Sequence, residues 1–250
     1  MDIVRDLLSR LPTNEPVRNI LVGVHWTVVC SRYCGMASTM QGDKPHGHEK
    51  VRDVGKLLEK TAYQLAEYAL SDVLLEASIG VAAINSLINP DEGGIADYRE
   101  INAYDVLARY GKEKKVALVG HFPFIPRLRQ EVGELWVIEQ KPIEGEHPVT
   151  AAARIISQAD VVALTGSALI NHTLEDMIGL CRPNSIVLIL GPSTPLSPVL
   201  FEYGATIISG ARVLDEQAVL RTVAQGANFQ QVQGVQLVTL SKPGFENQLQ

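Results

Sequence analysis

The sequence predicts an α/β protein with an N-terminal α+β part and a C-terminal part built on a parallel sheet. Residues 2–89 combine strand-like runs with apolar helical segments, and the charged cluster KEKK at 112–115 then marks a change of pattern. From residue 116 onward, five short apolar strands alternate with helices. Such alternation is typical of a doubly wound sheet with right-handed crossovers. We therefore expect two domains, comprising residues 1–111 and 112–250.

The composition favours a small-molecule ligand. The chain has 250 residues, of which 46% are apolar, enough to bury a sizeable core. Its net charge of -6 lacks the basic surface that nucleic-acid phosphates require, so we expect no nucleic-acid partner. We find neither a basic leader nor a run of ~18 apolar residues, and therefore expect no membrane partner and a cytoplasmic location. Three cysteines are too few for a disulfide framework, which agrees with a reducing compartment.

The N-terminal part begins with helical periodicity and continues with strands. Residues 2–10 place apolar side chains at helical spacing, which predicts a short amphipathic helix. Residues 17–30 are rich in β-branched side chains, and the run GMASTM follows, so we expect a hairpin or meander. Residues 51–70 contain one or two helices. The small sheet would expose an edge, which is a reason to expect a homodimer.

The segment from residue 73 to 89 is apolar nearly all round, and a helix of that kind is buried. Asn85 and Asn89 interrupt its apolar surface. Burying an amide without a partner is costly, so we expect these side chains to bond across a domain junction or to a ligand.

The C-terminal part has a regular order of elements. We expect strands at 116–119, 135–139, 161–165, 186–190 and 206–209, and helices at 125–132, 149–157, 174–180, 199–203 and 216–224. The tail from Gln230 alternates like an added edge strand. In such sheets ligands bind beyond the carboxyl ends of the strands, so the residues that follow each strand are the candidate site.

These strand-end residues offer hydroxyls, an imidazole, a carboxylate and free backbone N–H groups. They are Gly120, His121, Phe122 and Pro123; Glu139; Thr165, Gly166, Ser167 and Asn171; Gly191, Pro192, Ser193 and Thr194; and Gly210. An imidazole shielded by aromatic and proline neighbours can transfer protons, although a hydrogen bond to a neighbouring loop is an equal alternative for His121. The two hydroxyl-bearing loops resemble cradles for an anion or carbonyl, with helix capping as the simpler alternative.

The residues that follow the first strand indicate which cofactors the site could bind. Their sequence GHFPFIP lacks the glycines of the dinucleotide-binding fingerprint, which counts against a standard NAD site. Glu139 follows Gly120 by about 20 residues, where an acidic side chain can accept bonds from a ribose diol. Binding of a nucleoside-bearing cofactor such as S-adenosylmethionine therefore stays a possible role for Glu139. The alternative is that Glu139 is a solvated side chain at a strand end.

A candidate metal arrangement occurs in the N-terminal part. Cys30 and Cys34 are followed by His46 and His48, in the order C-x3-C…H-x-H. This spacing is not that of a standard zinc module, and the cysteines would straddle a turn between strands. Binding of a metal ion stays a hypothesis, and no ligands are assigned to it.

Four segments of the C-terminal part resemble a known family: GHFPFI, EQKP, ADVVALTGSALINHTLEDM and LGPSTPLSPVLFEYGA. They are similar to the DUF364 family, described as heavy-metal chelation proteins, with a preceding DUF4213 segment. The resemblance covers almost the whole chain. It implies an enolase N-terminal-like domain followed by a Rossmann-like domain, with the site at their junction, and a link to metal through a pterin-, flavin- or siderophore-like chelator. His147, in GEHP, stands where relatives usually carry an acidic residue, and the cysteine pair lies outside the family pattern.

The leading hypothesis is an enzyme that acts by condensation or hydrolysis on a small ligand of this kind in the inter-domain cleft. His121 would be the general acid or base, Glu139 would orient the ligand, and the polar edge would be held by Thr165, Ser167, Asn171, Ser193 and Thr194. One alternative is a non-catalytic protein that binds a metal or a metal–chelate complex. Another is a methyltransferase that uses S-adenosylmethionine.

Overall fold

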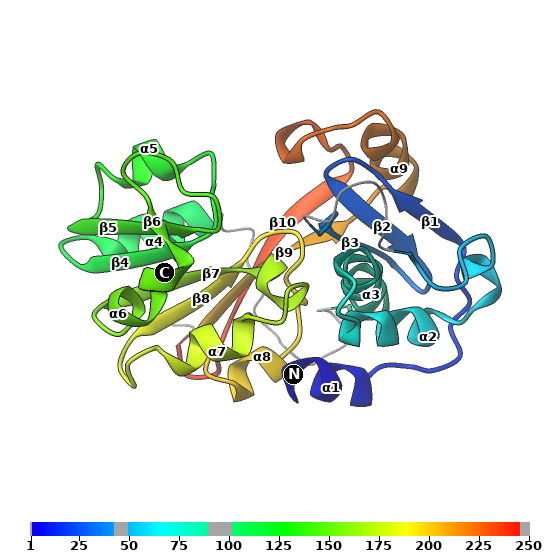
Figure 1. Ribbon diagram of the computed structural model, residues 1–250, viewed down its shortest axis with the longest axis horizontal. Helices are drawn as coiled ribbons and strands as arrows, with labels where there is room; N and C mark the ends of the chain where they lie inside the picture. Colours follow the sequence, from blue (N-terminus) through cyan, green and yellow to red (C-terminus); the bar gives the residue numbers. More distant parts are fainter. Residues whose placement is uncertain (1, 43–49, 90–101, 246–250) are drawn as a thin grey trace.

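Two sheets organise the chain, as the computed structural model in Figure 1 shows; it describes residues 2–42, 50–89 and 102–245. A three-stranded sheet has the order β1-β2-β3, and a seven-stranded sheet has the order β10-β9-β8-β7-β4-β5-β6. Within the larger sheet every pair is parallel except β9 with β10. The mixed α/β fold predicted from the sequence is therefore confirmed.

The N-terminal strands form an antiparallel meander. They are β1 (Asn19–Val22), β2 (Trp26–Cys30) and β3 (Cys34–Ser38). The strand-like run predicted over 17–30 is broken by a turn, where a Cβ on Gly23 would lie only 2.8 Å from Val223 Cγ1. Cys30 and Cys34 face each other in the register of β2 and β3 and form a disulfide. No disulfide framework was expected from three cysteines, but the register of this hairpin brings one pair together.

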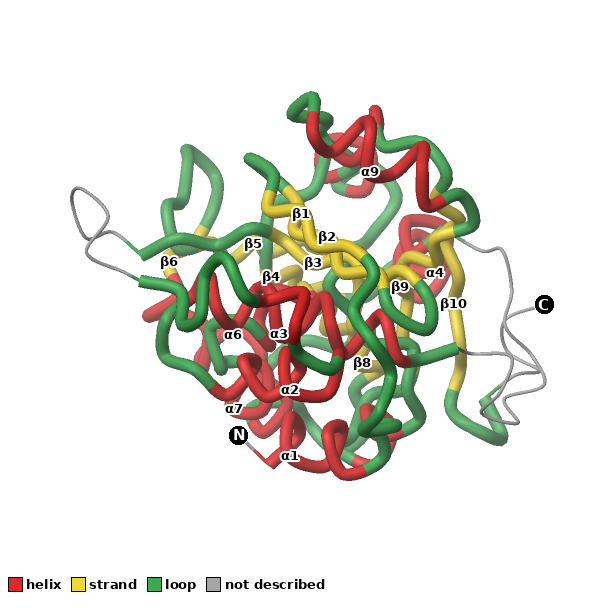
Figure 2. The backbone as a smooth tube through the Cα atoms, turned by 90° about the vertical axis from the view of Figure 1, so that its right-hand side faces the viewer, coloured by secondary structure: helices red, strands yellow, loops and turns green. Residues whose placement is uncertain are grey.

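Helices cover both faces of this small sheet. The N-terminal helices are α1 (Asp2–Ser9), η1 (Leu57–Glu59), α2 (Ala62–Ala66), η2 (Glu67–Leu70) and α3 (Leu74–Leu87). Helix α3 is buried on nearly all sides, as predicted, and packs against Val29 and Ala37. Val28 and Met36 point to the opposite face and pack against α9. Figure 2 shows the small sheet between these two helices.

The predicted strands of the C-terminal part occur in the larger sheet, in the predicted succession along the chain. Its strands are β4 (Lys115–Val119), β5 (Glu134–Glu139), β6 (His147–Pro148), β7 (Val161–Thr165), β8 (Ile186–Leu190), β9 (Ile207–Val213) and β10 (Val235–Ser241). Strand β6 was not predicted, since two residues that include a proline carry no strand pattern. The predicted edge strand in the tail is β10, which pairs antiparallel with β9.

The larger sheet carries helices on both faces, the arrangement expected of a doubly wound fold. The helices of this half are α4 (Ala103–Gly111), α5 (Ile125–Leu128), η3 (Val149–Ala151), α6 (Ala152–Ile156), η4 (Gly166–Leu169), α7 (Leu174–Gly179), α8 (Val199–Glu202), α9 (Glu216–Ala224) and η5 (Phe229–Gln231). Helices α4 and α5 pack on one face, while α6, α7 and α8 pack on the other. Within the described ranges, no helix has the length and apolar character needed to cross a membrane.

The two halves of the chain interlock. Helix α9 covers the N-terminal sheet, and α1 packs beside α8 through a two-pronged ion pair of 2.6 and 2.7 Å between Arg10 and Glu202. The Asn85 amide donates to Met36 O at 2.8 Å and to Pro192 O at 3.5 Å. The prediction that Asn85 bonds across the junction is thus confirmed. The domain boundary after residue 111 and the homodimer stay predictions.

Candidate functional site

The candidate site lies where the order of the parallel strands reverses. Strand β4 pairs with β5 on one side and with β7 on the other, and the chain then continues outward from β7 to β8 and β9. At such a switch point the loops after neighbouring strands diverge and leave a crevice. Strands β4 and β8 are each followed directly by a glycine with positive φ, 107° at Gly120 and 105° at Gly191. Because other residues rarely adopt this conformation, both strand ends require glycine to turn away from the sheet.

A cavity of about 660 Å³ occupies this crevice. The predicted site residues that line it are Gly120, His121, Phe122, Glu139, Thr165, Ser167, Asn171, Gly191 and Ser193, together with Pro123 and Pro192. The opposite wall comes from Trp26, Ser38 and Met40 of the N-terminal half and from Asn228, Phe229 and Gln230 around η5. The strand ends predicted from the sequence therefore meet in one place, and the cavity lies at the junction of the two halves.

Gly166 and Thr194 do not line this cavity. A Cβ on Gly166 would lie 2.4 Å from Thr194 Oγ1 and 2.6 Å from Thr194 N, so the two residues pack directly on each other. Both are buried. Their contact holds the loop after β8 against the loop after β7, and a role of either residue in ligand binding stays a prediction.

His121 is held by a carboxylate that the sequence analysis did not single out. Its Nδ1 lies 2.8 Å from Glu146 Oε1, and Glu146 Oε2 accepts a hydrogen bond from Ile143 N at 3.1 Å. The Glu146 side chain is only 4% exposed, whereas His121 is 53% exposed on the cavity. The pKa of Glu146 is lowered, first by the Ile143 N–H and then by His121, although burial opposes this. Glu146 is therefore ionised at neutral pH and favours a proton on Nδ1, which leaves Nε2 for a ligand.

The segment GEHP contains both Glu146 and His147, and the structure separates their positions. The acidic side chain in that segment is Glu146, which contacts His121, whereas His147 belongs to the short strand β6. A glutamate in a polar loop carries no local pattern that marks it as a partner of a histidine 25 residues earlier. The chain between them, which includes β5, has to fold before the two side chains meet.

The hydroxyl and amide groups of the loop after β7 are linked to one another. Thr165 Oγ1 and Ser167 Oγ are 2.9 Å apart, and Thr165 Oγ1 also accepts a bond from Ser167 N at 3.4 Å. Asn171 Oδ1 accepts bonds from the N and Oγ1 of Thr173. This fixes the Asn171 amide, so its Nδ2 group faces away from Thr173 as a donor. The loop thus presents preorganised polar groups at one edge of the cavity.

Ser193 uses its hydroxyl to connect the halves. Its Oγ accepts a bond from Ser38 N at 2.8 Å and lies 3.2 Å from Ser38 Oγ. Ser193 is 2% exposed, although it lines the cavity. The hydroxyl predicted to hold a ligand therefore bonds to β3.

Aromatic side chains form much of the wall. Trp26 and Phe229 meet edge to face with ring centroids 5.5 Å apart, and Phe122 stacks on Phe124 at 5.2 Å. Within the described parts of the chain, Trp26 Nε1 is buried without a hydrogen-bond partner. An unpaired indole N–H is costly to bury, so the packing of the Trp26 ring has to offset this cost. Neither Trp26 nor Phe229 was predicted, because they reach the cavity only through packing of α9 and its following loop on β2.

Glu139 lies on the cavity, half-buried, at the end of β5. Its Oε1 accepts a bond from the N–H of Gln140 at 2.8 Å, so the carboxylate folds back over its own backbone. Its role in orienting a ligand stays a prediction.

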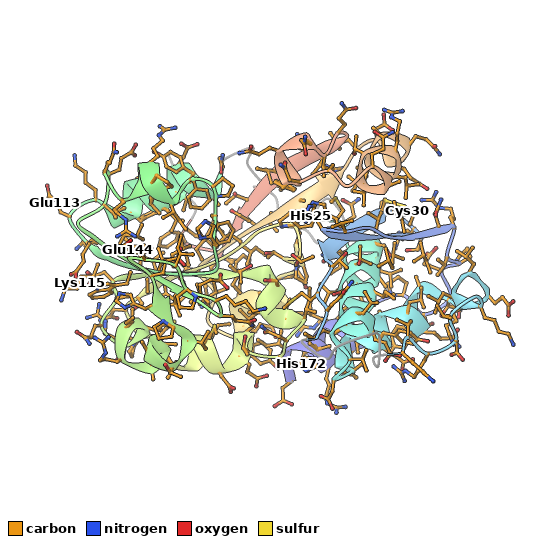
Figure 3. The ribbon with its side chains drawn as sticks, turned by 45° about the horizontal axis from the view of Figure 1, so that its top comes forward. His25, Cys30, Glu113, Lys115, Glu144 and His172 are labelled. Carbon is orange, nitrogen blue, oxygen red and sulfur yellow. A yellow bond between two sulfur atoms is a disulfide. The ribbon has the colours of Figure 1, made fainter. Side chains whose placement is uncertain are left out.

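The residues considered for metal binding are dispersed. Cys30 and Cys34 are joined in the disulfide, and His46 and His48 lie outside the described residues. Elsewhere, His25 is exposed beside β2, and His172 Nε2 lies 2.9 Å from Ala69 O (Figure 3). In the described ranges no group of three or more His, Cys, Asp or Glu side chains converges. Those ranges therefore do not supply a coordination sphere made of protein side chains alone.

The fold and the cavity define a Rossmann-like α/β protein with a ligand-sized cavity between its two halves. The family model DUF364, described as "Putative heavy-metal chelation", matches residues 102–241, which is more than half of the chain. The model DUF4213, with the same description, matches residues 4–88. The chain belongs to the DUF364 family, and the resemblance inferred from its motifs is confirmed.

Relatives agree with this assignment. An uncharacterised protein of Methanocaldococcus jannaschii, MJ0500, is 26% identical over 193 residues, which cover 74% of this chain and 72% of that protein. A crystal structure of a DUF364 protein of unknown function from Desulfitobacterium hafniense has a TM-score of 0.85 and 28% identity, covering 96% of this chain and 98% of the other. A second, from Pyrococcus horikoshii, has a TM-score of 0.80, 18% identity and the same coverage, and shows the fold alone.

Proposed function

We propose that the cavity binds a small, ring-bearing ligand rich in oxygen and nitrogen, and that the protein acts on it by condensation or hydrolysis. The observation that carries the proposal is the His121–Glu146 pair at the mouth of a mostly apolar cavity, at the switch point of the sheet. A pterin-, flavin- or siderophore-like chelator has the flat ring and polar edge that this cavity would accept, and it agrees with the description of the family.

His121 acts as the general acid or base in this proposal. Glu146, fixed by the Ile143 N–H, holds the proton on Nδ1 and stabilises the imidazolium when Nε2 takes a proton from the ligand or from water. Proton transfer by a positioned histidine contributes about 10²- to 10⁴-fold to a rate. Glu146 is thus a positioning residue, and His121 is the group that touches the reacting atoms.

The polar edge of the ligand is held at the strand ends. Glu139 accepts a hydrogen bond from the ligand, while Ser167 and the Asn171 amide form hydrogen bonds to the neighbouring edge of the ligand. The rings of Trp26 and Phe229 contact the ligand from the opposite wall. A ligand held from both walls would be oriented toward His121, which is the condition for efficient proton transfer.

The first test is native mass spectrometry with metal analysis of gently purified protein. A bound organic molecule is the expected result and identifies the ligand class. Pterins, flavins and S-adenosylmethionine then serve as probes in calorimetric titrations, where the proposal expects binding of a ring-bearing chelator-like compound. Binding of S-adenosylmethionine alone, with transfer of its methyl group, would replace the proposal with the methyltransferase alternative.

Substitutions separate the proposed roles. His121→Ala should lower turnover of the identified ligand at least about 100-fold and change its affinity by less than about 10-fold. Glu146→Gln should lower turnover less and shift its pH profile, because the amide no longer stabilises an imidazolium. Glu144→Gln is the matched control, since Glu144 is exposed in the same loop (Figure 3). The catalytic assignment is wrong if His121→Ala and Glu139→Ala both leave binding and turnover unchanged.

The family description favours a second candidate, a non-catalytic protein that binds a metal–chelate complex. Here the chelator supplies most of the coordination, and His121 Nε2 adds one donor to the metal. Native mass spectrometry would then show a metal together with an organic ligand, and His121→Ala would weaken retention of the metal with no turnover to lose. Metal at one ion per chain without an organic molecule would instead favour sequestration of the ion itself.

A further inference from the structure

The ring of Phe122 spans the strand ends at the switch point of the sheet. A Cβ on Gly120, directly after β4, would lie 3.2 Å from Phe122 Cε2 and 3.1 Å from Thr165 Cβ. A Cβ on Gly191, directly after β8, would lie 3.9 Å from Phe122 Cε1. Strand β7 runs between β4 and β8, so the two glycines follow strands that are roughly 9–10 Å apart. The phenyl ring therefore bridges the crevice directly above the edge of the sheet.

Nucleotide phosphates occupy this place in many doubly wound folds, where they bind against free backbone N–H groups. Here Gly120 N donates to Ile138 O at 3.0 Å. Gly191 N donates to Ser209 O at 3.0 Å, and Thr194 N donates back to Gly191 O at 2.9 Å. A phosphate at this edge would meet a phenyl ring and N–H groups that already have acceptors.

The charges around the cavity also disfavour a phosphate. Glu139 lines the cavity, and the buried carboxylate of Glu146 contacts His121. Among the described residues that line the cavity, none is a lysine or an arginine. A phosphate ester carries a charge of about −1.5 to −2 at pH 7, and burying an anion without a cation beside it is costly. An unphosphorylated ligand avoids this cost.

The ring of Phe122 is supported from one side by other aromatic side chains. Phe124 stacks on it with ring centroids 5.2 Å apart and an interplanar angle of 17°. Phe124 in turn contacts the ring of Tyr104 at a centroid distance of 5.9 Å. One face of Phe122 is thus covered, while the ring still lines the cavity. A planar ligand can stack on the face that remains.

We propose that Phe122 determines the specificity of the candidate site, which takes an unphosphorylated ligand with a flat aromatic ring. The ligand ring stacks on Phe122, and Trp26 and Phe229 face it from the opposite wall. Phe122 also keeps phosphate-bearing nucleotides away from the strand ends. This inference rests on the proposed function and narrows its ligand class to a free pterin, flavin or nucleoside, as opposed to the corresponding phosphate ester.

Two matched pairs of probes test this specificity in the wild-type protein: riboflavin with riboflavin phosphate, and adenosine with adenosine monophosphate. The members of each pair share a ring system and differ in the phosphate. Calorimetric titration at one ionic strength should show binding of the unphosphorylated member of at least one pair, and its phosphate ester should bind at least about 10-fold more weakly. A phosphate ester that binds within about 10-fold of its partner, or more tightly, would overturn the proposal, as would the absence of binding by all four probes.

Turnover separates this proposal from the proposed function. A preference for riboflavin over its phosphate, without turnover that depends on His121, supports the specificity and refutes the proposed chemistry. The relevant turnover is that of the ligand found by native mass spectrometry. Tight binding of riboflavin phosphate together with such turnover would lead to the opposite conclusion on both points.

Variants of Phe122 test whether its ring is the cause. Phe122→Leu keeps an apolar side chain above the strand ends but removes the flat ring, so it should weaken binding of the unphosphorylated probe by about 2- to 12-fold. Phe122→Ala should narrow the preference over the phosphate ester, because removing a clash admits the rejected ligand. Phe201→Leu is the matched control, since Phe201 is buried in α8 outside the lining of the cavity, and its affinity should stay unchanged.

The variants can contradict the proposal in two ways. Unchanged affinity in Phe122→Leu, or an equal loss in Phe122→Leu and Phe201→Leu, would refute stacking on Phe122. An unchanged preference in Phe122→Ala would refute its part in excluding the phosphate. Thermal unfolding shows whether each variant is folded, and the wild-type titrations decide the proposal if a Phe122 variant is not.

Discussion

The contact between Gly166 and Thr194 should decide both the stability of the protein and the shape of the site. In Gly166→Ala the new Cβ would lie 2.4 Å from Thr194 Oγ1, 2.6 Å from Thr194 N and 2.9 Å from Thr194 Cα. Two of these atoms belong to the backbone, so rotation of the Thr194 side chain cannot relieve the overlap. The loop after β8 has to move away from the loop after β7.

The expected magnitude follows from two opposing terms. Overpacking of a buried site costs about 1–3 kcal/mol, while replacing glycine by alanine stabilises by about 0.4–1 kcal/mol through the unfolded chain. The difference between the two terms lowers the free energy of unfolding of Gly166→Ala by up to about 2.6 kcal/mol. The displaced loop carries Ser193, whose Oγ accepts a bond from Ser38 N, so ligand affinity should fall as well.

Gly179→Ala is the matched control for this prediction. Gly179 ends α7, and a Cβ there would meet no atom within 4 Å. The same substitution should therefore stabilise the protein by about 0.4–1 kcal/mol and leave ligand affinity unchanged. Equilibrium unfolding in urea measures both variants, and each kcal/mol should also move Tm by about 2–4 °C in a chain of this size. The packing argument fails if Gly166→Ala is as stable as Gly179→Ala.

Two further predictions concern polar groups that burial makes costly. Trp26→Phe removes the buried, unpaired Nε1–H but keeps an aromatic ring, so the free energy of unfolding should change by less than about 1 kcal/mol and ligand affinity by less than about 2-fold. A larger loss of affinity in a titration would show that Nε1–H donates to the ligand. Burial would raise the pKa of Glu76, but hydrogen bonds from Ser71 Oγ and Arg52 lower it below the ordinary value of 4.5. The stability that Glu76 contributes is therefore present above about pH 4.5 and is lost as pH falls through the lower pKa of the folded state. Glu76→Gln should reduce the loss of stability in acid. An unaltered pH profile of urea unfolding would refute this assignment.

The order of elements in the larger sheet could be predicted because buried parallel strands carry their own signal. Strands β7 and β8 have the predicted bounds, and β4 and β5 differ by one residue at their start. A strand covered on both faces appears as a short apolar run, whatever its neighbours are. The turn at Gly23 could not be predicted in the same way, since it depends on the approach of Val223 from a distant helix.

The residues of the candidate site likewise differ in whether the sequence alone predicts them. His121, Glu139, Thr165 and Ser167 follow strand ends, and ligands bind beyond the carboxyl ends of parallel strands, so the sequence alone predicts that these residues share one site. Glu146 obeys no such rule, because its contact with His121 depends on how the loop after β5 folds back. The Cys30–Cys34 disulfide likewise follows from the register of one hairpin, which cysteine spacing alone does not determine.

The larger cavity requires both halves of the chain, and this has an energetic consequence. Its floor is the set of strand ends, its opposite wall includes Trp26 of β2 and Phe229 after α9, and Ser38 and Ser193 join the two across the junction. A ligand that touches both walls binds only the assembled protein, so it stabilises the folded chain by RT ln(1 + [L]/Kd), about 2.7 kcal/mol at 100 times Kd. Because the wall and the floor come from different halves, this stabilisation acts on the junction itself.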